Sequence, residues 1–73
     1  MEVKVLIKML GKKSLSGKAE LDKLPEQGDT IMLKGIRVLV KSAPQGTSIV
    51  CSPQSAGGYN QLKDAGYLET NGS

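Results

Sequence analysis

The side chain best suited to nucleophilic chemistry is Cys51, the only cysteine in a chain of 73 residues that contains no histidine. A reactive thiol needs a nearby positive charge or a helix N-terminus to lower its pKa. The preceding residues, Ile49 and Val50, are apolar and offer neither. Without histidine, the usual general base near neutral pH and a Cys/His metal site are both absent. We therefore predict a structural, buried Cys51, no enzymatic activity, no catalytic residue, no metal site and no cofactor.

A second candidate for chemistry is the glycine-bearing segment from Gly11 to Ala19, which is similar in outline to a phosphate-binding loop. That loop has four residues between its glycines, followed by Lys and then Ser or Thr for magnesium. Here five residues separate Gly11 from Gly17, and Ala19 stands where the hydroxyl is needed. The segment therefore predicts a mobile basic hairpin loop and not a nucleotide-hydrolase site.

Charged residues are grouped in blocks of opposite sign within a chain of net charge +3. Residues 1–18 carry five lysines against one glutamate, residues 19–33 four acids against one lysine, and residues 34–41 three bases. The acidic block lacks the spacing of a metal-binding loop and predicts a solvated loop. The basic blocks either form an ordinary solvated surface or hold phosphates of nucleic acid or a nucleotide. The candidate anion-binding residues are Lys4, Lys8, Lys12, Lys13, Lys34, Arg37 and Lys41.

The elements that must position these residues are mostly strands, because apolar and polar residues alternate with a period of two. We expect strands over Glu2–Leu10, Thr30–Leu33, Ile36–Lys41 and Ser48–Ser52, with Lys34-Gly35 as a tight turn. The segment Ser14–Leu24 is ambiguous: we favour a strand over Lys18–Asp22 that returns against the first, and the alternative is a helical turn at Leu21–Leu24. We also expect a loop over Pro53–Gly58. Tyr59–Ala65 is either a short helix closed by Gly66 or irregular.

These elements predict a mainly β domain over residues 1–68, with a flexible C-terminal end over 69–73. About five short strands at this spacing fit a half-open barrel or sandwich of the SH3-like or OB-like kind, with one short C-terminal helix as an option. A small α+β sheet is the alternative if Ser14–Leu24 is helical. A domain of this size has a thin core, so oligomerisation or partner binding is a natural source of extra stability.

A resemblance supports this architecture. The run from Leu24 to Val40 fits the pattern Leu-Pro-x-x-Gly-Asp-x-ϕ-x-ϕ-x-Gly-x-x-ϕ-x-Val, where ϕ is apolar. With the strand before it, it resembles small barrel proteins of phages and mobile elements, which include inhibitors of host defence and nucleic-acid binders. The match covers residues 24–40 of the chain. Ile36 and Val38 stand where that pattern often has an aromatic residue, which argues against a groove that stacks bases or binds peptides through aromatics.

Three outward leucines among the basic residues, together with Arg37, are the four candidate partner-binding residues. If strands 2–10 and 36–41 lie side by side, then Leu6, Leu10 and Leu39, with Arg37, form an apolar strip rimmed by positive charge. The alternative is that the rest of the domain covers these leucines. An exposed strip predicts a protein partner or a homo-oligomer.

Three hypotheses about function follow. The first is a non-enzymatic module that binds, and through that inhibits, a host protein. The others are an anion binder that takes up nucleic acid or a nucleotide, and a structural or assembly subunit. A lone cysteine without a disulfide framework favours the cytoplasm. Lys4 and Lys8 interrupt the only N-terminal apolar stretch, so we expect neither a signal peptide nor a membrane span.

Overall fold

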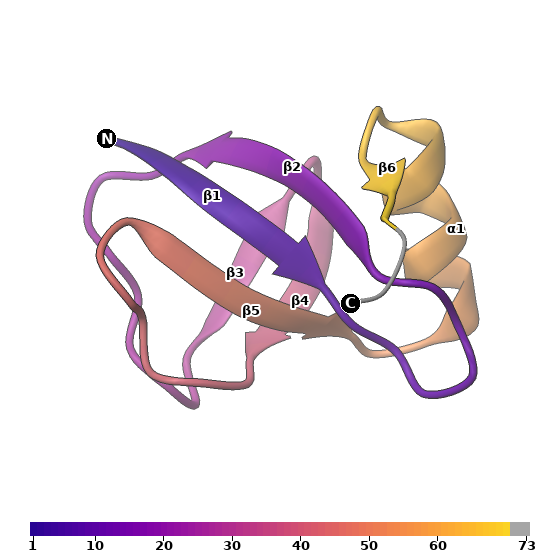
Figure 1. Cartoon of the computed structure of the whole chain (residues 1–73), viewed down its shortest axis with the longest axis horizontal. Helices are drawn as coiled ribbons and strands as arrows, with labels where there is room; N and C mark the ends of the chain where they lie inside the picture. Colours follow the sequence, from indigo (N-terminus) through magenta and orange to yellow (C-terminus); the bar gives the residue numbers. More distant parts are fainter. Residues whose placement is uncertain (71–73) are drawn as a thin grey trace.

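The computed structural model describes residues 1–70 and contains one six-stranded sheet with one helix (Figure 1). The strand order is β3-β4-β5-β1-β2-β6, and every neighbouring pair is antiparallel except β1 and β5, which are parallel. The predicted mainly β class with a half-open sheet is confirmed. The elements are β1 (Glu2–Ile7), β2 (Leu15–Glu20), β3 (Thr30–Leu33), β4 (Ile36–Val40), β5 (Ser48–Pro53), α1 (Ala56–Asp64) and β6 (Leu68–Glu69).

The sheet curls around a core made by alternate residues of its strands. In Figure 1, β1, β2 and β5 lie in front of β3 and β4, and α1 closes one end. Strands β1 to β5 direct β-branched or other apolar residues inward, because side chains alternate between the two faces of a sheet. Tyr59 and Leu62 of α1 complete this interior. The hydrophobic core of the described chain consists of Val3, Val5, Ile7, Leu15, Leu33, Val38, Val40, Ile49, Cys51, Tyr59, Leu62 and Tyr67.

The turn between β3 and β4 has the geometry that the sequence predicts. Lys34 has φ 52° and Gly35 has φ 79°, so both central residues are left-handed. Two such residues make a type I′ turn, whose twist matches that of the flanking strands. The pair that flanks the turn is Leu33 with Ile36.

The ambiguous segment Ser14–Leu24 forms a strand, β2, which begins three residues before the predicted Lys18. Its alternation is weak in the sequence because two of its inward positions are Gly17 and Ala19. Position 17 is a glycine because the Tyr67 ring, fifty residues later in the sequence, packs directly on it. A Cβ on Gly17 would stand 2.7 Å from Cδ2 of Tyr67. A larger inward residue would therefore displace the tyrosine ring.

The helix begins earlier than predicted, so the expected loop over Pro53–Gly58 is wrong at both ends. Pro53 belongs to β5, and the Ser55 side chain caps α1 by accepting a hydrogen bond from the Gly58 N–H at 3.3 Å. An oxygen at this position satisfies a donor that the first helical turn leaves free.

With nine residues in α1, the part of the chain that the structure describes has no helix able to cross a membrane.

Two further expectations differ from the structure. The packed chain continues past residue 68, since β6 pairs with β2 and the Thr70 N–H donates to the Ser14 carbonyl at 2.8 Å. Residues 71–73 of the expected flexible end lie outside the described residues. The strands that carry Leu6 and Leu39 share the sheet, but the expectation that they lie side by side is wrong. The β4–β5 hairpin inserts β5 between them, because β5 pairs with β1 on one side and β4 on the other.

Replacing Gly17 by Ala tests the contact between β2 and Tyr67. The added methyl overlaps the ring, and overpacking of this kind costs about 1–3 kcal/mol of unfolding free energy. We expect that loss in urea denaturation of Gly17→Ala. The outward Ser16→Ala on the same strand should change stability by less than about 0.5 kcal/mol. Equal stability of the two variants would show that Tyr67 does not constrain this strand.

Candidate functional site: a groove on the outer face of the sheet

The outer face of the central strands carries the residues that sequence analysis singles out on β1. Leu6 lies opposite Val50 of β5 on one side and Ser16 of β2 on the other. Lys4, the next outward residue of β1, lies between Ser48 of β5 and Lys18 of β2. Lys4 and Leu6 alternate along β1 with the buried Val5 and Ile7, so their side chains lie on the solvent side of the sheet.

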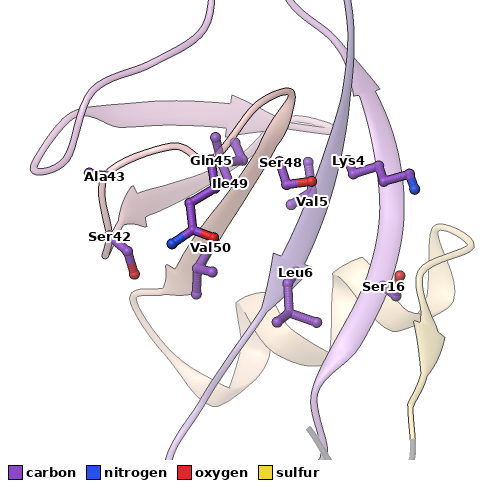
Figure 2. Close-up of a pocket in the computed structure, with 10 residues that line it drawn as sticks. All are labelled: Lys4, Val5, Leu6, Ser16, Ser42, Ala43, Gln45, Ser48, Ile49 and Val50. Atoms are coloured by element: carbon purple, nitrogen blue, oxygen red, sulfur yellow. The ribbon is translucent and has the colours of Figure 1, made fainter.

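These strands and the β4–β5 loop enclose a groove of about 340 Å³ (Figure 2). Leu6 and Val50 form its apolar floor, and both are only partly exposed. The loop is held in place by two backbone hydrogen bonds of 3.0 Å between Gln45 and Ser48, one in each direction. Serines, a glutamine and a lysine surround the floor. The lining residues are Lys4, Val5, Leu6, Ser16, Ser42, Ala43, Gln45, Ser48, Ile49 and Val50.

The four predicted partner-binding residues do not form one patch. Leu39 is on the outer face of β4 and 37% exposed, but it lies opposite Ser52 and Thr30, with β5 between it and Leu6. Arg37 is farther out, opposite Met32 of β3. Leu10 is fully exposed in the β1–β2 turn, away from the strands. Only Leu6 lines the groove.

The predicted anion-binding residues also separate. Lys4, Lys8, Arg37 and Lys41 belong to the outer face of β1 and β4 or directly follow these strands. Lys12 and Lys13 lie beside α1, where the Lys12 Nζ is 5.8 Å from the centre of the Tyr59 ring and the Tyr59 hydroxyl donates to the Lys13 carbonyl at 2.7 Å. Lys34 occupies the β3–β4 turn. One continuous phosphate-binding face is therefore not formed.

The charge around the groove is positive because nearby acids are already paired. Glu2 contacts Lys18 at 3.8 Å, and Glu20 contacts the N-terminal ammonium group at 3.0 Å. Within residues 1–70, no ion pair is formed by Lys4, Lys8, Arg37 or Lys41. Within these residues Lys4 thus borders the apolar floor without an acidic partner, an arrangement that complements a ligand bearing both apolar and anionic groups.

Cys51 lies in the core, as predicted, with no exposed surface. Burial raises the pKa of its thiol from 9.0 to about 11, which suppresses the nucleophilic thiolate. Burial also raises the pKa of Tyr67, with a further contribution from the neighbouring Cys51. In the described part of the chain, no three acidic or cysteine side chains gather as metal ligands.

The groove residues on β5 and its loop were missed by sequence analysis. Val50 was placed in a strand, but its outward position follows only from the alternation of Ser48, Val50 and Ser52 with Ile49 and Cys51. Gln45 had no signal, since its position depends on the conformation of a loop. Protein-family models, curated proteins and solved structures give no match to this chain. The groove therefore has to be interpreted from its own chemistry.

The thiol of Cys51 provides a pH test of the core. A pKa that is higher in the folded state stabilises the protein below about pH 9, and this stabilisation is lost as the pH rises toward about 11. We expect the unfolding free energy of the wild type to fall more steeply between pH 8 and pH 11 than that of Cys51→Ala, measured by urea denaturation. The same slope in both proteins would contradict a thiol buried in the neutral form.

Proposed function

We propose that this chain is a non-enzymatic binding module that holds a protein partner in the groove between β1, β5 and the β4–β5 loop. The observation that carries the proposal is the apolar floor of Leu6 and Val50 beside Lys4, which forms no ion pair within residues 1–70. The buried, protonated state of Cys51 supports a role without covalent chemistry.

The groove defines the chemistry of the partner. An apolar side chain fits over Leu6 and Val50, where it is removed from water. Carboxylates flanking that side chain meet Lys4 and, farther along the same face, Lys8 and Lys41. The polar side chains of Gln45 and Ser48 add hydrogen bonds at the rim. Such an anchor with a charged surround is the usual anatomy of a protein interface.

The biological setting of the proposal comes from the resemblance of residues 24–40. Small barrel proteins of phages and mobile elements include inhibitors of host defence. We accordingly place the partner among host proteins of the cytoplasm and propose that occupying it inhibits it. The alternative role of a structural subunit uses the same groove with another copy of the chain as its partner.

A second candidate function, binding of nucleic acid or a nucleotide, is favoured by the cations without acidic partners on the outer face. It is weakened by the position of the aromatic residues. Tyr59 and Tyr67 are each only 3% exposed, so neither is free to stack on a base. A polyanion bound by phosphate contacts alone is released steeply as salt rises, which separates it from an apolar anchor.

The test compares two leucine variants of the immobilised chain. Leu6→Glu places a charge on the groove floor, whereas Leu10→Glu changes an exposed leucine outside the groove and is the matched control. Nuclease-treated host lysate is passed over each protein, and captured proteins are quantified by mass spectrometry. We expect a partner retained by the wild type and Leu10→Glu but reduced at least about tenfold by Leu6→Glu, equivalent to about 1.4 kcal/mol.

Thermal unfolding of both variants is measured as a control, and each should unfold at a temperature close to that of the wild type. Capture that is equal for Leu6→Glu and the wild type overturns the proposed groove. A second run uses untreated lysate, and capture from it that is lost on nuclease treatment or in moderate salt for all three proteins favours the nucleic-acid alternative.

A further inference from the structure

The two edges of the curled sheet approach each other and leave an open seam. Strand β6 pairs only with Leu15 and Ser16, so the rest of β2 has no second neighbour. Strand β3 pairs only with β4. The free parts of both edges line one hollow of about 230 Å³, formed by Lys18, Ala19, Glu20, Leu21, Met32, Leu33, Lys34 and Tyr67. A second hollow of about 340 Å³ continues beside Thr30 and Ile31.

The backbone of β2 directs unpaired groups into this seam. Met1 and Leu21 exchange hydrogen bonds in both directions, which makes them a bonded antiparallel pair. Bonded pairs alternate along such a ladder, so Ala19 bonds to β1 while Lys18 and Glu20 direct their N–H and C=O groups away from it. Within residues 1–70 the Lys18 carbonyl has one weak partner there, the Tyr67 hydroxyl at 3.5 Å.

The backbone of β3 also directs unpaired groups into the seam, from the opposite edge. A two-residue turn makes Leu33 and Ile36 the bonded pair that closes the hairpin. Ile31 therefore also bonds to β4, and Thr30 and Met32 direct their backbone groups into the seam. The bond from the Val40 N–H to the Asp29 carbonyl, at 2.8 Å, agrees with this alternation.

The β3 edge is short, with four residues, but it lacks the other features that prevent strand addition. Natural edge strands are protected by lysine, proline, bulges or a covering segment. The sequence Thr30–Leu33 contains no charged residue and no proline, and Met32 is 55% exposed. The open part of β2, by contrast, carries Lys18 and Glu20. Of the two edges, β3 is therefore the one that accepts another strand.

We propose that an extended segment of a partner protein pairs with β3 and lies in the seam beside β2. Such a segment sits about 4.8 Å from the edge it joins. It meets apolar Leu21 and Leu33 on its inner side and solvent on its outer side, so its residues alternate between apolar and polar. This site is separate from the groove that holds Leu6.

The charges at the ends of the seam specify how the segment is oriented. Lys18 and Lys34 line the hollow beside Met32, whereas Asp22 and Asp29 line the hollow beside Thr30. Lys18 and Glu20 are already paired, with Glu2 and with the N-terminal ammonium group, so Lys34 sets the charge at the first end. At the other end, Asp22 and Asp29 outnumber Lys23. The segment is therefore acidic near Lys34 and basic near Asp29.

The experiment selects binders from a displayed library of random ten-residue peptides against the whole chain. We expect enriched peptides with alternating apolar residues and opposite charges at their two ends. In ¹⁵N-labelled protein, the synthetic peptide should slow hydrogen exchange of the Thr30 and Met32 amides at least tenfold. Met32→Pro removes the N–H that faces the seam and should weaken binding at least tenfold, while Leu6→Glu, in the groove, should bind as the wild type does.

A peptide methylated on the amide nitrogens that face β3 gives the same test without altering the protein, should Met32→Pro reduce stability. Failure to enrich any peptide, binding that Met32→Pro and amide methylation leave unchanged, or protection confined to residues of the groove overturns the proposal. Because the groove variant is scored separately, failure at the seam leaves the proposed function of the groove intact.

Discussion

The parallel pairing of β1 with β5 is the contact on which the rest of the structure depends. It joins the N-terminal hairpin of β1 and β2 to the hairpins formed by β3, β4 and β5. Without it, the two groups of strands would each expose one apolar face, and neither alone is large enough for a stable core. The pairing also brings Val50 beside Leu6, and it makes β3 and β6 the edges of the sheet.

The connection between β2 and β3 runs along the open seam. After β2, the chain has to return past the sheet to begin β3, and residues 21–29 make that connection. Part of the connection, including Leu21, Asp22, Lys23, Pro25 and Asp29, lines the hollow at one end of the seam. The chain thus spans the gap between the edges with side chains and a loop, where a closed barrel would use backbone hydrogen bonds.

Local patterns in the sequence predict the elements whose reasons are local. The alternation of Val3, Val5 and Ile7 identifies β1, and Lys34-Gly35 identifies the turn because glycine accepts positive φ. Strand β2 was ambiguous because Gly17 is small in order to accommodate Tyr67, fifty residues away. The capping of α1 by Ser55 is also local. The sequence indicates this helix start only weakly, because Gly57 and Gly58 follow directly and glycine disfavours a helix.

The candidate site was only partly predictable for the same reason. Periodicity correctly placed Lys4 and Leu6 on one outward side of β1. Periodicity does not say which strand is the neighbour, so the expected strip from Leu6 to Leu39 is interrupted by β5. Lys12 and Lys13 appeared to belong to a basic face, but tertiary contacts with Tyr59 hold them beside the helix. No local pattern in the sequence reveals an unpaired edge, because the edge depends on the order of all six strands.

The two proposed surfaces obtain binding energy by different physics, and this difference matters for so small a domain. The groove offers apolar area and charge, which select a side chain and its neighbours. The seam offers backbone donors and acceptors of Lys18, Glu20, Thr30 and Met32, and the Lys18 carbonyl already has a weak partner there, the Tyr67 hydroxyl at 3.5 Å. A strand that pairs there gains net hydrogen-bond energy of only about 0.5–1.5 kcal/mol per bond, but it also covers the part of Leu21 that the free chain exposes. A ligand that binds only the folded state stabilises that state by mass action. Occupying the seam therefore supplements a thin core at the place where its sheet is incomplete.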